Sequence, residues 1–108
     1  MNQTRYITAG TDENGYPATF ITRCNVWVQD GSGSTSDGGG ALTGLGNLVI
    51  GYNEQSNSTS LCTGSHNLIV GYENSYSAYA GLVAGFYNEI SAPWATVSGG
   101  SNNIASGA

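Results

Sequence analysis

The sequence predicts an all-β fold: a parallel β-roll or β-helix, that is, a solenoid built from coils of about fourteen residues. Two observations predict this fold. Glycines recur at fixed intervals, and a short apolar segment precedes each glycine. Gly71, Gly85 and Gly99 stand fourteen residues apart. Residues 47–52 (NLVIGY) also nearly repeat residues 67–72 (NLIVGY), twenty residues later. Since short fixed periods are typical of stacked repeats, we expect one coil of two short strands and two turns per repeat.

The N-terminal part of the chain reads differently from this array. Residues 5–9 and 19–29 carry the β-branched and aromatic residues typical of strands. Residues 11–15 (TDENG) form a polar turn between them. Residues 30–40 contain Gly, Ser, Thr and Asp without an apolar side chain, which is typical of a surface loop. We therefore divide the chain into an N-terminal strand segment with a Gly/Ser-rich loop, residues 1–40, and a solenoid array, residues 41–108.

Within each repeat, both faces of the first strand are apolar. Side chains alternate along a strand, so Leu68 and Val70 face one way and Ile69 faces the other. A single coil needs only its inner face apolar, and the second apolar face indicates that another copy of the chain covers it. The candidates for this self-association are Val49, Ile69, Val83, Val97, Tyr72, Phe86 and Trp94.

The turns of each repeat have their own residues. Glycine can adopt turn conformations closed to other residues, which assigns structural turns to Gly51, Gly71, Gly85 and Gly99. Asparagine tolerates left-handed backbone angles and can stack into a ladder, which assigns the next corner to Asn74, Asn88 and Asn102. Tyr76, Ile90 and Ile104 follow in step as the second strand. The six extra residues of the first repeat are expected as a loop within residues 55–61.

Residues 82–108 resemble the head repeats of trimeric autotransporter adhesins of the YadA-like kind. The segment 96–100 (TVSGG) followed by 105–107 (ASG) fits their pattern of two small-residue strands joined by a turn. The wider stretch 44–108 also looks like a segment of large bacterial surface proteins. This resemblance implies a left-handed parallel β-roll, a trimer with a hydrophobic threefold interface, and a place on the cell surface. The chain departs from the family in its bulky aromatics, among them Tyr52, Tyr72 and Phe86.

Composition and charge restrict the partners. Of 108 residues only 8% are charged, and seven acids face two bases, Arg5 and Arg23, for a net charge of −5. This balance argues against nucleic acid or an anionic membrane as a partner. No apolar stretch approaches the roughly 20 residues of a membrane span, and residues 1–5 lack the apolar core of a secretion signal. We expect an extracellular or cell-surface chain whose signal was removed or whose export follows another route.

No residue set predicts catalysis or a cofactor. His66 occupies a turn without a clear nucleophile or metal partner. Asp30 and Asp37 bracket the Gly/Ser loop, which favours a solvated loop over calcium, since their spacing matches no calcium motif. Cys24 and Cys62 match no metal spacing, so the alternatives are a disulfide between them and two thiols.

These patterns predict a non-enzymatic extracellular structural or adhesive module that forms a homotrimer through the apolar faces of a β-solenoid. The alternative is a filament subunit that stacks head to tail, with residues 1–30 bridging to the next copy. Further alternatives are a phage fibre and a glycan-binding module that uses the aromatic side chains. The partner in the first two readings is the chain itself, and the sequence identifies no host-surface or glycan ligand.

Overall fold

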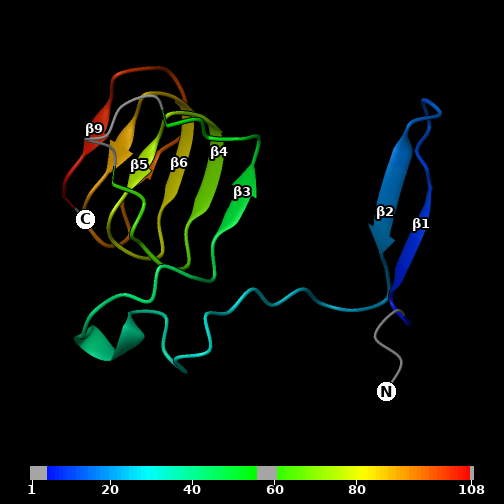
Figure 1. Ribbon diagram of the computed structural model, residues 1–108, viewed down its shortest axis with the longest axis horizontal. Coiled ribbons are helices and arrows are strands. Elements are labelled where there is room, and N and C mark those ends of the chain that lie inside the picture. Colours follow the sequence, from blue (N-terminus) through cyan, green and yellow to red (C-terminus); the bar gives the residue numbers. More distant parts are fainter. Residues whose placement is uncertain (1–4, 56–60, 108) are drawn as a thin grey trace.

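The computed structural model describes residues 5–55 and 61–107, and over these ranges the protein is essentially all-β (Figure 1). The strands are β1 (Ile7–Thr11), β2 (Pro17–Ile21), β3 (Leu48–Ile50), β4 (Leu68–Tyr72), β5 (Ser75–Tyr76), β6 (Leu82–Phe86), β7 (Glu89–Ile90), β8 (Thr96–Val97) and β9 (Ile104–Ala105). A 3-10 turn, η1 (Asp37–Gly39), lies in the Gly/Ser-rich loop. No helix of the described residues is long and apolar enough to cross a membrane.

Two parallel sheets form the body of the protein, which we define as residues 41–55 and 61–107. One sheet has the strand order β3-β4-β6-β8 and the other β5-β7-β9, and the chain alternates between them from β4 to β9. Leu68 pairs with Leu82, and Leu82 with Thr96, so residues fourteen positions apart lie side by side. Leu48 pairs with Leu68 across the longer interval of twenty residues. The repeat alignment predicted from the sequence is therefore the strand register.

The last repeat departs from the fourteen-residue spacing by one residue. Glu89 pairs with Ile104, and Ile90 with Ala105, whereas the spacing predicted Ile104 beside Ile90. The extra residue lies in the preceding corner, where the amide of Phe86 bonds the carbonyl of Gly100 at 3.0 Å. The equivalences past β8 therefore shift by one, because the constant spacing holds only for the earlier repeats.

The core lies between the two sheets, and a row of side chains from the first sheet forms its centre. Ile69 and Val83 are 0% exposed, and Val97 is 8% exposed. Ile90 and Ala95 close the cluster, with Tyr76, Ala92 and Ala105 packed against it. Each buried aliphatic side chain of this size contributes about 1.5–3 kcal/mol. Three of the predicted self-association residues are thus inside the protein, which corrects their assignment to an outer surface.

The N-terminal strands form an antiparallel hairpin, in which Ile7 pairs with Ile21 and Thr11 with Pro17. The carboxylate of Asp12 accepts the amides of Asn14 and Tyr16 and so closes the turn. Strand β2 ends at Ile21 rather than continuing to residue 29. Residues 24–29 have no partner strand among the described residues, and Arg23 takes a left-handed φ of 60°, so residues 22–29 form an arm to the body. Figure 1 shows the hairpin standing apart, beyond the β3 side of the body.

The loop predicted at residues 55–61 falls largely on residues 56–60, which lie outside the described residues. The chain on either side of that gap joins the two sheets. Leu48–Ile50 belong to the first sheet, and Cys62 forms a parallel bridge with Tyr76 of the second.

Candidate functional site

An apolar face covers the outside of the β3-β4-β6-β8 sheet. The second residue of each strand, which is Val49, Ile69, Val83 or Val97, belongs to the inner row that points toward the second sheet, so the residues before and after it point outward. The outward row is Leu48, Ile50, Leu68, Val70, Leu82 and Ala84, and we call it the outer apolar face. Leu48 and Ile50 are 51% and 54% exposed, and the other four are half-buried between their neighbours. The outside of the sheet therefore carries a continuous row of aliphatic side chains on β3, β4 and β6.

Val49 has a different environment from its equivalents in the inner row. It aligns with Ile69, yet it is 43% exposed, because β3 is the first strand of its sheet and no strand lies on its other side. Strand β8 forms the opposite edge. In the second sheet, β9 is the corresponding edge, and its Ile104 is 69% exposed. Both ends of the stack therefore present strand edges.

Aromatic side chains pair on the surface of the body in two sets. Tyr72 and Phe86 pair across β4 and β6 with ring centroids 5.2 Å apart. Tyr79 and Trp94 meet edge to face at 5.1 Å. Tyr72, Phe86 and Trp94 remain 38%, 47% and 58% exposed. Of the predicted self-association residues, these three and Val49 are the ones that lie at the surface.

A ladder of asparagine side chains ties the repeats together at one corner. The amide of Asn74 bonds the side-chain oxygen of Asn53, that of Asn88 bonds Asn74, and that of Asn103 bonds Asn88, at 2.7–3.0 Å. The fourth position belongs to Asn103 rather than to the predicted Asn102, because of the extra residue in the last corner. Sequence reasoning also missed Asn53, which stands two residues after Gly51 and two before the loop that interrupts the period.

A second, shorter ladder runs along another corner. The side-chain oxygen of Asn47 accepts the amide of Asn67 at 2.8 Å, and that of Asn67 accepts the amide of Gly81 at 2.8 Å. Their side-chain nitrogens bond backbone carbonyls, among them that of Ala78 at 3.0 Å. The signal for this ladder was in the sequence, since both asparagines open the repeated NLVIGY and NLIVGY segments.

The turn glycines are required where two backbones approach closely. A Cβ on Gly71 would overlap the carbonyl of Gly85, and one on Gly85 would overlap the carbonyl of Gly100. Gly51, Gly71 and Gly85 also have left-handed φ angles of 99°, 123° and 114°. Gly99 has neither constraint, whereas Gly100 has a φ of 84°. The fourth turn glycine is therefore Gly100, one residue later than predicted.

The Gly/Ser-rich loop is fastened to the body by Asp30, Asp37 and His66. The Asp37 carboxylate accepts the hydroxyl of Ser65 at 2.8 Å and the amide of Thr43 at 2.7 Å. The Asp30 carboxylate accepts the hydroxyl of Thr43 at 2.6 Å, and its side chain is 1% exposed. The hydrogen bond with Asp37, followed by that with Thr43, holds the pKa of Asp30 well below its ordinary 3.8.

These three side chains come within 4.8 Å of one another and so have the composition of a metal site. Their atoms are already engaged, however. Nε2 of His66 accepts the Asp30 amide at 3.1 Å, which places the proton on Nδ1, where it is donated to the Thr35 carbonyl at 3.0 Å. Because the Nε2 lone pair of His66 is used in this hydrogen bond, we interpret the three side chains as a hydrogen-bonded cluster that orients the loop, and we assign no cation to them.

The two cysteines are both thiols in the structure, Cys24 exposed on the arm and Cys62 half-buried in the body, so the disulfide alternative is not formed. Burial raises the pKa of the Cys62 thiol, and its sulfur lies 3.7 Å from the Asn74 carbonyl. Burial also raises the pKa of the neighbouring Tyr76 hydroxyl. Both shifts favour neutral side chains and a packing role.

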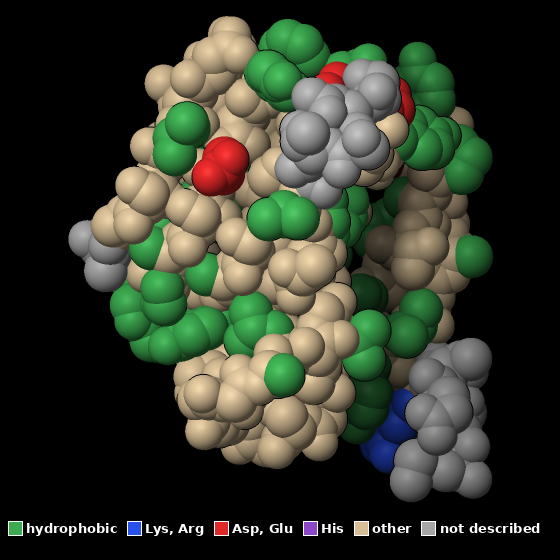
Figure 2. All heavy atoms as spheres, turned by 60° about the vertical axis from the view of Figure 1, so that its left-hand side comes forward, with side chains coloured by type: hydrophobic (Ala, Val, Ile, Leu, Met, Phe, Trp, Pro, Cys, Tyr) green, Lys and Arg blue, Asp and Glu red, His purple; other side chains and the backbone are tan. Residues whose placement is uncertain are grey.

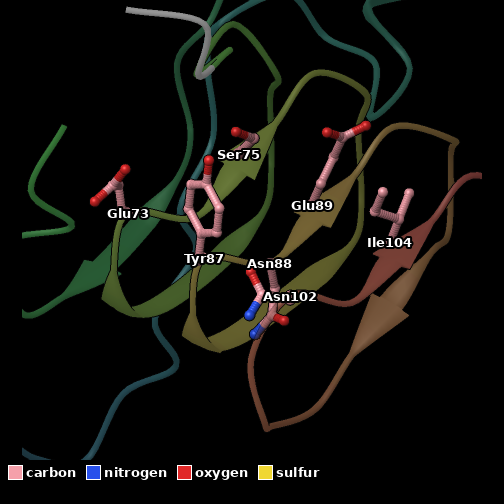
Figure 3. Close-up of a pocket in the computed structure, with 7 residues that line it drawn as sticks. All are labelled: Glu73, Ser75, Tyr87, Asn88, Glu89, Asn102 and Ile104. Carbon is pink, nitrogen blue, oxygen red and sulfur yellow. The ribbon is translucent and has the colours of Figure 1, made fainter. Parts of the chain in front are cut away.

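A shallow hollow of about 220 Å³ lies over the second sheet (Figure 3). Its rim carries two carboxylates, Glu73 and Glu89, with the ring of Tyr87 between them and Ile104 of β9 at the far side (Figure 3). Ser75, Asn88 and Asn102 complete the lining. The hollow combines negative charge with aromatic and aliphatic surface, which suits a cationic side chain with an apolar stem.

No family model, curated protein or solved structure matches this chain. Its function must therefore be argued from its own surfaces.

Proposed function

We propose that this protein is a non-enzymatic structural or adhesive module that associates with copies of itself. In this proposal the two parallel sheets are the sides of a left-handed β-solenoid of about fourteen residues per coil, displayed outside the cell or on its surface. The in-register pairing of successive repeats and the asparagine ladders support the solenoid, since stacked identical positions are typical of that architecture.

The outer apolar face is the observation that carries the proposal. Six aliphatic side chains lie side by side on three neighbouring strands. Parallel sheets occur almost always with both faces covered, and here the inner face packs on the core while the outer one has no cover within the described residues. A second copy supplies a matching apolar surface, and closed symmetry covers every copy equally.

A homotrimer is the closed arrangement that we propose. Three flat sheet faces meet around a threefold axis, as the resemblance of residues 82–108 to trimeric adhesin heads implies. The outer apolar face itself has no charged side chain, so no like charges meet where such faces pack together.

Light scattering coupled to size-exclusion chromatography tests this arrangement. The full chain is expected to elute with the mass of three 11.1 kDa copies. Val70→Asp places a charge in the outer apolar face and should shift the mass toward that of the monomer. Ser91→Asp, exposed after β7 in the other sheet, is the matched control and should leave the mass unchanged. A monomeric wild-type chain at micromolar concentration would contradict the trimer.

A filament that grows by head-to-tail stacking is the second candidate. The exposed edges of β3 at one end and of β8 and β9 at the other support it, because unpaired strand edges are templates for further pairing. The inner row then continues from Val97 of one copy to Val49 of the next. Negative-stain micrographs distinguish the candidates, since fibres support stacking and discrete particles across pH and salt oppose it.

A further inference from the structure

The β1–β2 hairpin exposes apolar side chains that nothing else in the described chain covers. All its residues except Ala18 are exposed in the described chain, including Ile7 at 46%, Phe20 at 39% and Ile21 at 50%. An isolated two-stranded hairpin is at best marginally stable in water. A hairpin with aliphatic and aromatic residues exposed on both faces is therefore expected to dock against another surface.

The charges of the chain indicate what that surface is. Arg5 and Arg23 flank the hairpin, one just before β1 and the other just after β2. From residue 24 onward the chain has five carboxylates and neither lysine nor arginine. Figure 2 shows the arginine side chains in one corner of the visible face, apart from the carboxylates. No ion pair between either arginine and a carboxylate occurs among residues 5–55 and 61–107. The base of the hairpin, where Arg5 and Arg23 lie, is thus opposite in charge to the body, whereas Asp12 and Glu13 lie in the turn at the other end of the hairpin.

The complementary site lies at the opposite end of the body from the hairpin. The hollow beside Glu89 is formed by the β5-β7-β9 sheet and includes Ile104 of the terminal strand β9. In Figure 1 the hairpin stands beyond β3, whereas β9 is at the far side of the body. A hairpin carried at one end and a receiving site at the other describe a head-to-tail contact between two copies.

The arm has the length that such a contact needs. The eight residues 22–29 would span at most about 28 Å if fully extended, and the left-handed φ of Arg23 shortens that reach. Strands in a sheet are about 4.8 Å apart, so in a second copy placed on the β3 edge, Glu89 of β7 lies about two strand spacings, or 10 Å, from the junction. The arm therefore reaches past the terminal strand of that copy to the hollow.

We propose that the β1–β2 hairpin is a clasp that docks on a second copy of this chain, with Arg23 and Arg5 facing the Glu89 hollow. The exposed apolar residues of the hairpin then cover the aromatic and aliphatic rim formed by Tyr87 and Ile104. The clasp rests on end-to-end association, the second candidate function, and is independent of the trimer. Because each copy has one clasp and one hollow, the contact propagates in one direction.

Two reciprocal variants of the full chain test the clasp. Arg5→Glu with Arg23→Glu reverses the clasp charges and leaves the hollow intact, whereas Glu89→Arg reverses the hollow and leaves the clasp intact. Each variant alone should associate at least about tenfold more weakly than wild type in sedimentation velocity, equivalent to about 1.4 kcal/mol. Glu54→Arg, which changes a body carboxylate outside the hollow by the same charge, should retain wild-type association.

The decisive measurement mixes the two variants. Both contacts between unlike chains are then matched in charge, the native clasp with the native hollow and the reversed clasp with the reversed hollow, so the mixture should form an alternating complex that neither variant forms alone. Raising the salt concentration should dissociate it, because the Debye length falls from about 10 Å at 0.1 M to about 3 Å at 1 M. A mixture no more associated than its components overturns the clasp, as does wild-type association by either variant alone.

The same experiment distinguishes a failure of the clasp from a failure of head-to-tail stacking or of the trimer. If fibres persist in the arginine variant, stacking is correct and the clasp is wrong. If wild type forms trimers and no longer species, end-to-end association and the clasp both fail while the trimer stands. The experiment also detects docking of the hairpin on the body of its own chain, because the variants would then change the stability of the chain without changing the mass of the sedimenting species.

Discussion

The body and the hairpin contain similar side chains, yet only the body buries them. Ile69 is 0% exposed, whereas Ile21, in a strand of equal length, is 50% exposed. The difference is that strand β4 of the body has neighbours on both edges and a second sheet behind it, and the hairpin strand β2 has one partner strand and no sheet behind it. Burial in this protein therefore follows from the stacking of repeats, and residue type alone does not secure it.

The largest contrast is expected for glycine substitution at the turns. In Gly71→Ala the new Cβ overlaps the Gly85 carbonyl at a left-handed φ, which should cost about 3–5 kcal/mol from backbone strain and overpacking together. Urea unfolding followed by tryptophan fluorescence measures it. Gly99→Ala, with open space around the new Cβ, should change stability by less than about 0.5 kcal/mol. Equal losses would contradict the assignment of the turn to Gly100 in place of Gly99.

Next in size is truncation of the inner row. Ile69→Ala removes a fully buried side chain, and the expected loss is about 3 kcal/mol in the free energy of unfolding. Ile21→Ala in the hairpin should cost less than about 1 kcal/mol in the monomer, because half of that side chain is already in water. Both are measured by thermal and urea unfolding at a concentration where the chain is monomeric. A large loss for Ile21→Ala would mean that the hairpin docks on its own body.

The asparagine ladder should give an intermediate effect. Asn74→Ala removes the acceptor of the Asn88 amide and the donor to the carbonyls of Val70 and Gly85. Leaving these buried groups unsatisfied should cost about 2 kcal/mol. Asn25→Ala, on the exposed arm, is the matched control and should be neutral within about 0.5 kcal/mol. Chemical denaturation measures the free energy of unfolding of both variants. If Asn74→Ala leaves it unchanged, the ladder does not contribute to stability.

The smallest expected effect concerns pH and is confined to the Gly/Ser-rich loop. The folded pKa of Asp30 lies below its ordinary 3.8, so its ionised form stabilises the loop at every pH above 3.8. That contribution is lost as the pH falls below 3.8 through the depressed folded pKa. The amide NMR signal of Ser32, which donates to Asp30 at 2.8 Å, should shift in this range while the Val83 signal does not. Asp30→Asn should abolish the shift, and a shift that persists in that variant would assign the titration to another group.

Sequence reasoning could go far within the regular repeats and less far outside them. Fourteen-residue spacing placed Gly71 and Gly85, Asn74 and Asn88 correctly in the strand register. It failed by one residue at Gly99 and Asn102, because an added residue in a corner leaves the local pattern unchanged and shifts only the register of later residues. The pattern of residues 24–29 likewise predicted a strand, but a strand needs a hydrogen-bonding partner, and none lies beside them in the described chain.

The sequence by itself determined the all-β class, the period of the parallel sheets and the alternation of side chains along each strand, because these depend on local spacing and residue type. Only the tertiary structure decided which face is inside. Leu68, Ile69 and Val70 are all apolar, so their pattern is symmetric, and the position of the second sheet selects Ile69 as the buried one. The same holds for the hairpin, whose isolation and charge relation to the distant Glu89 hollow arise from chain geometry that no local pattern encodes.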